Sequence, residues 1–505
     1  MVCLPDFKEF IKLARKGNVI PVFTEILADT ETPVSAFLKI KEEGYSFLLE
    51  SVEGGEKIGR YSFMGTNPSL IFRYKNKKVT IKQGKETFTF VTEDSPLDEI
   101  NNMLKNLKVV EVKGLPRFCG GFVGYVGYDI VTTFENIKIN KKDDLGLDDM
   151  IFIMADTVLI FDHVGHKIKI VVNVFLEDNP KESYQKAVRK IKTIIKKLSE
   201  NTIEDYENTN YSEVSLKPQK SFFSHNIRSN FSKKQFMKIV DKAKKYIYAG
   251  DIIQVVLSQR FKTALKKAKP FDLYRALRTV NPSPYMFYID FKELQLVGSS
   301  PELLVRCENH ILETRPIAGT RPRGRTEAED EKFKKELLAD PKEIAEHIML
   351  VDLGRNDLGR VSEAGSVKTE EFMAIEKYSH VMHIVSSVKG VLEKTKYPTD
   401  VIKATFPAGT VAGAPKVRAM QIIEELENIK RGIYAGCIGY IDFSGNIDTC
   451  IAIRTILIKG ENAYVQAGAG IVADSKPAKE YEETRNKARA LMKAIEIAEA
   501  LRSKK

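Results

Sequence analysis

Two pairs of glutamates, each spaced by three residues, are the clearest sign of chemistry in this sequence. Glu343 and Glu346 occur in PKEIAEHIMLVDL, and Glu480 and Glu483 occur in SKPAKEYEETRNK. Residues three apart on a helix share one face, so each pair would present two carboxylates side by side. Two such turns facing each other would form an all-oxygen site that suits Mg2+. Taken alone, either pair is equally explained as an acidic first turn favoured by the helix dipole.

A second group of polar residues lies among Pro and Gly residues in ETRPIAGTRPRGRTEAED. We predict a flexible basic loop that could guard an acidic substrate, with a solvated surface loop as the alternative; its arginines are Arg315, Arg321, Arg323 and Arg325. The run PAGTVAGAPKVRAMQII resembles a phosphate-binding loop, but Pro415 separates Gly413 from Lys416 and no hydroxyl residue follows the lysine. We therefore expect no nucleotide site there.

The elements that must position the second glutamate pair can be read from its flanks. Pro477 suits a first helical turn, and Asp474 or Ser475 suits the cap before it. The spacing of Glu483 and Lys487 adds a charge pair on the same helix. The pattern predicts a helix that begins near Pro477 and displays both carboxylates in its first two turns.

Three regions differ in composition along the chain. Residues 1–200 mix helical stretches with alternating strand-like runs and are predicted to form one α+β unit. Residues 201–230 are polar and aperiodic, which indicates a linker. Residues 231–505 alternate apolar strand candidates with helices and tight turns, and they contain both glutamate pairs.

Bulk properties restrict the class of protein. With 505 residues, 43% of them hydrophobic and 29% charged, the chain has a globular composition. It contains no apolar run of roughly 18 to 20 residues and no signal-peptide core, so we expect a cytoplasmic protein without a membrane partner. The net charge of +11 reflects 79 basic against 68 acidic residues, a mixed surface that does not call for nucleic acid. The five scattered cysteines indicate neither disulfides nor a zinc site.

Five segments taken together resemble the chorismate-utilising enzyme family. They are SPELLVR (300–306), PIAGTRPRG (316–324), EHIMLVDLGRNDLGRV (346–361), FPAGTVAGAPKVRAM (406–420) and GAGIVADS (468–475). The resemblance covers residues 231–495, and the first 200 residues resemble the family's regulatory half. It implies an α+β fold in which two packed, mainly antiparallel sheets form a sandwich with helices outside.

The resemblance also implies a site. Mg2+ would be bound directly by Glu346 and Glu483 and through water by Glu343 and Glu480. Glu302 matches the general acid that assists loss of the C4 hydroxyl of chorismate, His383 matches a histidine near the leaving groups, and Thr410 matches a residue near the ring. The positions that match substrate-binding residues are Gly319, Thr320, Tyr434, Arg454, Gly468, Ala469 and Gly470.

Two positions report which nucleophile attacks chorismate. Family members that activate water carry lysine where this chain has Gln254, because a lysine of depressed pKa can act as the base. Many members of the folate branch carry a ring-attacking lysine where this chain has Ala318. The resemblance therefore implies attack by ammonia and formation of anthranilate and pyruvate, the step that commits chorismate to tryptophan. An aminodeoxychorismate synthase of the folate branch is the alternative, and a binding protein that has lost catalysis is disfavoured because all four glutamates are present.

A regulatory site and a partner complete these expectations. The residues that resemble the two halves of a tryptophan-binding feedback site are Glu50, Ser51, Pro282, Pro284, Tyr285, Met286 and Tyr440. The chain contains no Gly-x-Cys-x-Gly nucleophile loop, so it carries no glutaminase of its own. The resemblance implies a separate glutamine amidotransferase subunit that supplies ammonia, in a complex of two plus two subunits.

Overall fold

Two large β-sheets dominate the computed structural model, which describes residues 2–51, 59–176, 179–200, 227–378 and 381–502. Each sheet has twelve strands, and the strands pair antiparallel. Sheet A contains, in spatial order, β1 (Val19–Leu27), β10 (Lys167–Phe175), β9 (Thr157–Asp162), β3 (Tyr61–Thr66), β2 (Tyr45–Glu50), β13 (Tyr285–Phe291), β14 (Gln295–Ser300), β23 (Thr455–Lys459), β24 (Asn462–Ile471), β12 (Gln254–Ala264) and β11 (Arg228–Ser229), with β20 (Gly413–Ala414) paired to β12. Sheet B contains β17 (Ile317–Pro322), β19 (Val381–Val391), β16 (Ile311–Thr314), β15 (Leu303–Glu308), β22 (Ile447–Ile451), β21 (Cys437–Asp442), β7 (Gly121–Val126), β8 (Met150–Ala155), β4 (Leu70–Lys75), β5 (Lys78–Gln83) and β6 (Glu86–Val91), with β18 (Lys368–Lys377) paired to β19.

The central strands are apolar on both faces because both faces of each sheet are covered. In β13, Phe287 and Ile289 point into a core that also contains Val123 and Ile153 of sheet B, so this core fills the space between the sheets. Tyr288, on the opposite face of β13, joins a core that lies under helices. An unbroken apolar run is what a strand buried on both faces requires.

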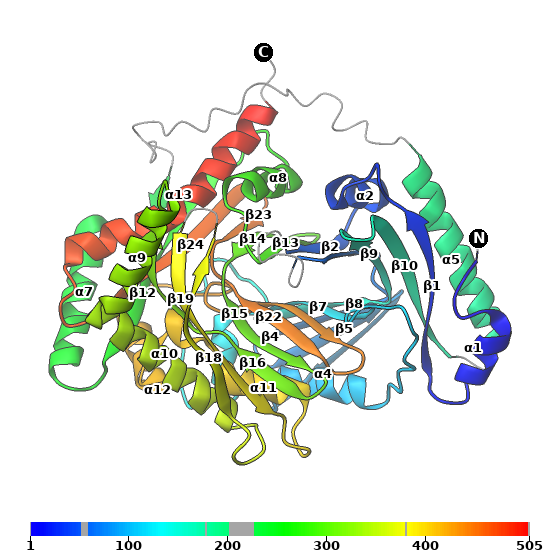
Figure 1. Ribbon diagram of the computed structural model, residues 1–505, viewed down its shortest axis with the longest axis horizontal. Helices are drawn as coiled ribbons and strands as arrows, with labels where there is room; N and C mark the ends of the chain where they lie inside the picture. The colour runs from blue at the N-terminus through cyan, green and yellow to red at the C-terminus, as the bar shows by residue number, and fades with distance from the viewer. Residues whose placement is uncertain (1, 52–58, 177–178, 201–226, 379–380, 503–505) are drawn as a thin grey trace.

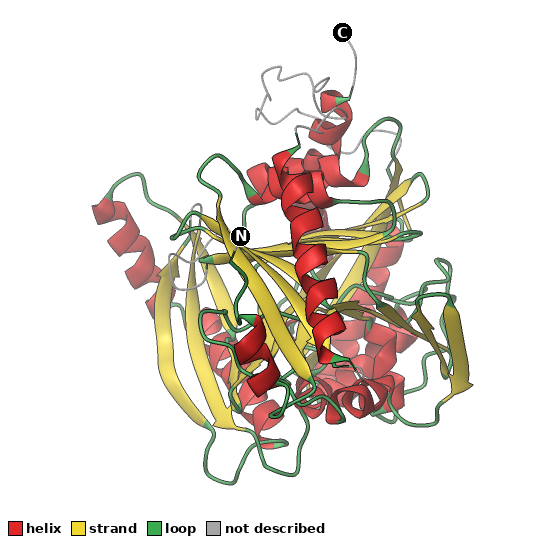
Figure 2. Cartoon of the chain, turned by 90° about the vertical axis from the view of Figure 1, so that its right-hand side faces the viewer, coloured by secondary structure: helices red, strands yellow, loops and turns green. Residues whose placement is uncertain are grey.

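Helices form the outer layers (Figure 1). Those packed on sheet A are α1 (Phe7–Leu13), α2 (Pro33–Ile40), α5 (Pro180–Ser199), α8 (Pro270–Val280) and α13 (Pro477–Leu501), and Figure 2 looks onto the side where α1 and α5 lie against β1 and β10. Those packed on sheet B are α4 (Pro96–Lys105), η1 (Tyr128–Thr133), α9 (Glu327–Ala339), α10 (Pro341–Gly359), α11 (Pro398–Thr405) and η2 (Gly409–Val411), while α7 (Lys233–Tyr248) and α12 (Lys416–Leu426) pack on β12. The predicted fold, a sandwich of two antiparallel sheets with helices outside, is confirmed.

The N-terminal and C-terminal halves of the chain contribute to both sheets. In sheet A, Glu50 of β2 pairs with Met286 of β13, and in sheet B, Gly121 of β7 pairs with Asp442 of β21. In each sheet the N-terminal strands form one contiguous block and the C-terminal strands another, and the blocks meet at β2–β13 and at β7–β21. Most of the predicted linker, 201–226, lies outside the described residues, and the division into 1–200 and 231–505 stays a prediction. None of the described helices combines the length and the apolar character that crossing a membrane requires.

Candidate active site and inhibitor cavity

The two acidic turns lie at the starts of α10 and α13. α10 begins at Pro341, where Asp340 accepts hydrogen bonds from the backbone amides of the first turn. α13 begins at Pro477 as predicted, but its cap residue is Lys476, whose side chain makes no capping hydrogen bond. The predicted cap by Asp474 or Ser475 is therefore wrong: the Ser475 hydroxyl instead accepts a hydrogen bond from the amide of Val472, at 3.1 Å.

Electrostatics connect the two turns. Burial and the neighbouring Glu343 raise the pKa of Glu346, and Lys342 and Lys487 act in the opposite direction. Burial and Glu483 raise the pKa of Glu480, and Lys342 again opposes the shift. Lys342 of α10 thus acts on a carboxylate of each turn, and Lys487 of α13 reaches Glu346 across the gap. The two turns belong to one electrostatic environment.

The acidic turns fit a hard divalent cation by their donor chemistry. Their four carboxylates repel one another, and Arg321 and Lys487 hold two of them, with Arg321 Nη1 at 3.2 Å from Glu343 and Lys487 Nζ at 2.7 Å from Glu483. Among the described residues, no three acidic, histidine or cysteine side chains already lie close enough to enclose a metal ion. An added divalent charge would relieve the repulsion between these oxygen ligands.

Glu302 is a carboxyl that stays protonated near neutral pH. It precedes β15, and its carboxyl lies deep within the surrounding protein. Burial raises the pKa of Glu302 to about 7, although the neighbouring Thr410 hydroxyl and the Lys487 ammonium favour the charged form. Oγ1 of Thr410 is buried and makes no hydrogen bond of normal geometry to the described residues. A neutral acid beside an unused hydroxyl suits proton transfer to a bound ligand.

Arg454 is a cation without a counter-charge. It has a positive φ of 49° after β22, and no described carboxylate lies within ion-pair distance of it. Burial lowers the pKa of Arg454, and the adjacent Tyr434 opposes the shift. A side chain at Gly468 would place its Cβ 2.6 Å from the Tyr434 hydroxyl oxygen, so glycine is needed there. The arginine, the tyrosine and the glycine backbone form a site ready for a carboxylate.

His383 is fixed by the edge of sheet B. Its Nδ1 lies 2.9 Å from the carbonyl oxygen of Gly319 and 3.1 Å from the Thr320 hydroxyl. A carbonyl only accepts, so Nδ1 carries the proton and Nε2 of the neutral ring has the free lone pair. Burial lowers the pKa of His383, which favours this neutral form. Gly319 has a φ of 67° and a Cβ there would lie 3.2 Å from Oε2 of Glu343, which places this loop beside the first acidic turn.

Gln254 lies between the glycine strand and the first acidic turn. Its amide favours the charged form of Glu346. A Cβ on Gly470 would come within 2.6 Å of its Nε2. Gly470 belongs to the same strand, β24, as Gly468 and Ala469, and all three pair with β12. Catalytic and substrate-binding predictions from distant parts of the sequence therefore meet around β12, β24, α10 and α13.

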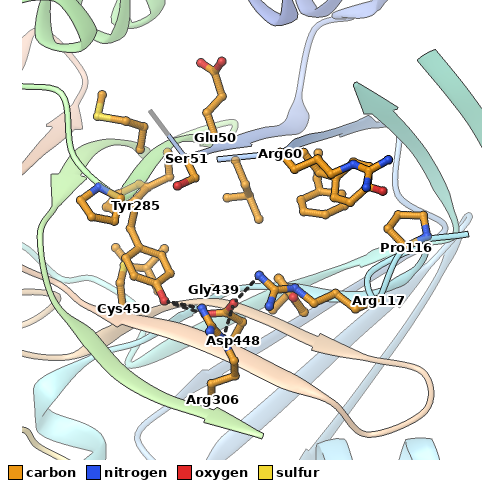
Figure 3. A pocket seen from close by; sticks show the side chains of 18 of the residues that line it. Glu50, Ser51, Arg60, Pro116, Arg117, Tyr285, Arg306, Gly439, Asp448 and Cys450 are labelled. Carbon is orange, nitrogen blue, oxygen red and sulfur yellow. Dashed lines mark hydrogen bonds and ion pairs between the residues drawn. The ribbon is translucent and has the colours of Figure 1, made fainter. Parts of the chain in front are cut away.

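A separate cavity of about 300 Å3 opens where β2, β13, β21 and β22 approach one another (Figure 3). Five of the predicted tryptophan-binding residues besides Glu50 line it: Ser51, Pro284, Tyr285, Met286 and Tyr440. Pro282 is not among its lining residues. The two sequence segments proposed for a single ligand site thus face one cavity.

The floor of the cavity is a charged network that no pattern in the sequence predicted. Asp448 accepts hydrogen bonds from the Tyr285 hydroxyl at 3.0 Å and from Nε of Arg306 at 3.1 Å, and Nη2 of Arg117 lies 3.1 Å from it (Figure 3). Burial lowers the pKa of Arg306, but Asp448 and Tyr285 outweigh burial, and the net shift is upward. Arg117 also lies 3.4 Å from Glu308, and Arg306 lies 3.5 Å from Glu313, so carboxylates hold both guanidinium groups in place at the cavity floor.

Glu50 directs its carboxyl away from this floor, as Figure 3 shows. The carboxyl accepts a hydrogen bond from Tyr274 and lies 3.2 Å from Nε of Arg278, both on α8. Its Oε1 is buried without a hydrogen-bond partner among the described residues. Glu50 therefore links the cavity wall to α8. Its contact with the amino group of a ligand stays a prediction, and Oε1 is the oxygen that would make this contact.

Comparison with known protein families explains this arrangement. A family model described as chorismate binding enzyme matches residues 45–493. This chain belongs to the chorismate-binding enzymes.

Within the chorismate-binding enzymes, full-length relatives place the chain with anthranilate synthase component 1. The component 1 protein of Aquifex aeolicus is 54% identical and that of Acetivibrio thermocellus 51% identical, with 98% and 99% of each chain covered. The crystal structure of anthranilate synthase component I from Streptococcus pneumoniae superposes with a TM-score of 0.76 at 37% identity, covering 92% of this chain and 99% of that one. The menaquinone-specific isochorismate synthase of Escherichia coli, at 19% identity and a TM-score of 0.69, shares the fold.

Sequence reasoning missed one group of this chorismate-binding enzyme entirely. Arg431 is buried, and its guanidinium pairs with Glu427, donates to the carbonyl oxygens of Val411 and Val256, and stacks over the rings of Tyr128 and Tyr434. The arginine thereby fixes Tyr434 and the η2 turn that carries Thr410. The one signal in the sequence was the four-residue spacing of Glu427 and Arg431, which is typical of an ion pair on a helix.

The prediction of a flexible basic loop is wrong about the secondary structure of this segment. Residues 317–322 form β17, and neighbouring carboxylates bind three of the four arginines, while Arg325 is exposed. Arg315 pairs with Glu376, Arg321 donates to Asp340 at 2.8 Å, and Arg323 donates to Asp330 at 2.7 Å. Because their charges are already compensated, these arginines hold α9, α10 and β18 against the strand and do not form a flexible guard.

Proposed function

We propose that this chain is the chorismate-converting subunit of an anthranilate synthase, which turns chorismate and ammonia into anthranilate, pyruvate and water. The observation that supports the choice of nucleophile is the environment of Gln254 and Ala318. Gln254 stands beside Glu346 at the position where water-activating relatives have lysine, and Ala318 is buried in β17. Neither side chain is a base or an amine, so ammonia, which needs no strong base, is the nucleophile that fits.

Glu302 is proposed to act as the general acid. Its pKa of about 7 keeps a large fraction protonated at neutral pH, ready to donate to the departing C4 hydroxyl. The C4–O bond breaks and the hydroxyl leaves as water, while ammonia forms a bond to C2 and gives up a proton. Elimination of pyruvate from the aminated ring then produces the aromatic product. Lys487, close to Glu302, would stabilise the carboxylate that remains.

Arg454, Tyr434 and the backbone at Gly468 are proposed to hold the enolpyruvyl carboxylate. An uncompensated buried arginine gains most from an anionic ligand, and the tyrosine hydroxyl reaches the glycine strand. Thr410 would face the ring, and the free Nε2 of His383 would accept a proton near the leaving groups. Fixing the ring between these groups supplies the orientation that the two successive steps need.

We propose Mg2+ as the cofactor, held by Glu346 and Glu483 directly and by Glu343 and Glu480 through water. The raised pKa of Glu346 and that of Glu480 support the proposal, because two carboxylates that repel their neighbours favour a cation between them. When bound, the ion supplies a Lewis acid for the ring carboxylate of chorismate. When the ion binds, the ion pairs Lys487–Glu483 and Arg321–Glu343 would open, and the two carboxylates would turn to the ion.

Ammonia is proposed to come from a glutamine amidotransferase subunit in a complex of two plus two subunits. Relatives named as component 1 support the existence of a second component. The cysteines support it independently: burial raises the pKa of Cys119 and Cys437 to about 12 and of Cys307 to about 11, and it also raises the pKa of Cys3 and of Cys450. None is a poised thiolate, and five free thiols fit a cytoplasmic protein.

Feedback inhibition by tryptophan is proposed for the cavity at β2 and β13. Its volume of about 300 Å3 and its apolar wall suit an indole ring, and the guanidinium groups of Arg117 and Arg306 suit a carboxylate. Met286 and Pro284 form part of that wall. Tyr285 of β13 pairs with Ser300 of β14, two residues before Glu302, so a ligand against Tyr285 contacts the strand next to the one that leads to the general acid.

The test is an assay of the purified chain with chorismate, Mg2+ and ammonium, followed by anthranilate fluorescence with and without tryptophan. Fluorescence that requires Mg2+ and falls on addition of tryptophan is the expected result. Consumption of chorismate without anthranilate would assign the chain to the folate branch instead. Absence of any consumption would remove the enzymatic proposal.

A further inference from the structure

The strand β6 ends sheet B with an open edge. All six of its residues are exposed, and β5 is its single neighbour among the described strands. Phe88 is 51% exposed, Phe90 39% and Val91 68%, high values for apolar side chains in a strand. An exposed edge with apolar side chains is a template for pairing with another strand.

The other sheet ends are protected, in contrast to β6. At the far end of sheet B, β17 is covered by α9 and α10, and β18, whose single partner among the described strands is β19, has two breaks in its register and a lysine at each end. β1 is bridged at its edge by Leu4 and Val109, and β11 and β20 have two residues each. β6 contains neither lysine nor proline, its register with β5 is unbroken, and its single charged residue, Glu86, lies at one end, so the middle of the strand has none of the devices that block edges.

Hydrogen bonding fixes which residues of β6 face outward. The amide of Thr92 donates to the carbonyl oxygen of Lys77, at 2.9 Å. Antiparallel hydrogen bonds recur at every second residue, so Phe90 and Phe88 are also bonded to β5, in register with Val79 and Ile81. The backbone groups of the three alternate residues point away from β5; these are Thr87, Thr89 and Val91.

We propose that the β6 edge binds a second copy of this chain, antiparallel and centred on Thr89. A two-fold axis at Thr89 brings Thr89 of the two copies opposite each other and Thr87 opposite Val91, which are the residues with unused backbone groups. Phe88 then lies opposite Phe90 twice, and these rings continue the apolar face formed by Val79 and Ile81.

Charge supports the same register. With Thr89 at the centre, Lys85 of one copy lies opposite Glu93 of the other, on both sides of the axis. A centre at Phe88 or Phe90 would match residues whose backbone groups already bond to β5. A centre at Thr87 or Val91 would use the outward groups but lose these ion pairs and shorten the overlap. Only the register at Thr89 satisfies backbone, aromatic and charge pairing together.

The β6 edge lies at the opposite end of sheet B from β17, which carries Gly319 and Thr320 of the candidate active site. Pairing through β6 therefore leaves both active sites open to chorismate and to an amidotransferase. The inference does not depend on the proposed function, although a complex of two plus two subunits would contain such a contact. One strand pair is a small interface, so the dimer is expected to depend on protein concentration.

The test measures the mass of the full-length chain by sedimentation velocity in tenfold concentration steps. Thr89→Pro removes an outward N–H that β5 does not use, so the fold is expected to survive while the dimer is lost. Thr89→Val, which keeps the backbone group, is the matched control and is expected to remain dimeric. Ammonium-dependent activity, measured in parallel, is expected to be unchanged in both variants.

A charge exchange gives an independent measurement that does not require proline to be tolerated. Lys85→Glu places a carboxylate opposite Glu93 and is expected to weaken dimerisation about tenfold, and the double variant K85E/E93K is expected to restore it. The Lys77–Glu93 pair that the double variant removes is exposed and contributes little. A wild-type chain that stays monomeric at every concentration, or a dimer unaffected by the charge exchange, would overturn the proposal.

Discussion

Glu302 and Arg454 form no ion pair with the described residues, whereas in the cavity at β2 and β13 Asp448 is held by Arg117, Arg306 and Tyr285. In the first region burial moves the pKa of Glu302 upward and that of Arg454 downward, toward neutral pH. In the second, opposite charges outweigh burial and hold the pKa of Arg306 above its ordinary value.

The difference separates Glu302, which must change its charge state to act as an acid, from Asp448 and its partners, which must keep theirs. A general acid works best when its pKa lies near the working pH. A recognition site works best when its charges are constant and oriented before the ligand arrives. The same fold achieves both because the partners of each group come from different strands and helices.

The strongest test of the comparison is Glu302→Gln, which keeps the shape of the side chain and removes its proton. We expect the ammonium-dependent kcat to fall by about 100- to 10,000-fold, the range for loss of a general acid. Tryptophan affinity, measured by calorimetry, is expected to be unchanged. Glu461→Gln, in the exposed turn between β23 and β24, is the control. Full activity of the Glu302 variant would remove the acid role.

Asp448→Asn tests the charged network at the floor of the cavity. It leaves Arg117 and Arg306 without their shared counter-charge, and removal of one partner of a buried charge pair costs about 2 to 5 kcal/mol. We expect a lower melting temperature and tryptophan binding weakened at least tenfold, with kcat in the absence of tryptophan retained. Asp94→Asn, at an exposed site, is the control. Unchanged tryptophan affinity would show that the network does not hold the ligand.

The pH dependence of stability sharpens the comparison further. The folded pKa of Glu302, about 7, exceeds the ordinary value of 4.5, so the folded state keeps a proton that the unfolded state loses. Stability is therefore fully present below about pH 4.5 and falls as the pH rises to about 7, by up to about 3 kcal/mol. Denaturant unfolding of the wild type and of the Glu302→Gln variant measures this, since the variant should lack the decline. Parallel curves for the two proteins would contradict the raised pKa.

The smallest expected effect is that of Tyr285→Phe. The variant removes a hydroxyl that donates to Asp448 and accepts from Nη2 of Arg306, while the apolar wall of the cavity remains. A hydrogen bond of this kind contributes about 1 kcal/mol, so tryptophan should bind about fivefold more weakly. Tyr61→Phe, in the same cavity, is the matched control. Equal losses in both variants would mean that the hydroxyl network has no special role.

Local patterns in the sequence predicted local features well. Pro477 marked the start of α13, and the spacing of the glutamates placed each pair in one helical turn. What could not be read were contacts between distant segments, such as Arg117 with Asp448 or Arg431 with Tyr434, because no local pattern encodes them. The arginines of β17 were misread for the same reason: Asp330, Glu376 and Asp340, which compensate them, follow in later elements.

The pairing of β2 with β13 and of β7 with β21 affects how the chain folds during its synthesis. Glu50 leaves the ribosome long before Met286, and Gly121 long before Asp442, so the N-terminal block of each sheet has an unpaired edge, at β2 and at β7, until the later strands are made. Such distant pairings fold slowly, and unpaired edges invite aggregation while they wait. The nascent N-terminal half is therefore the part of this protein with the greatest need of a chaperone, and a chain cut between α5 and β11 would yield two fragments that must find each other.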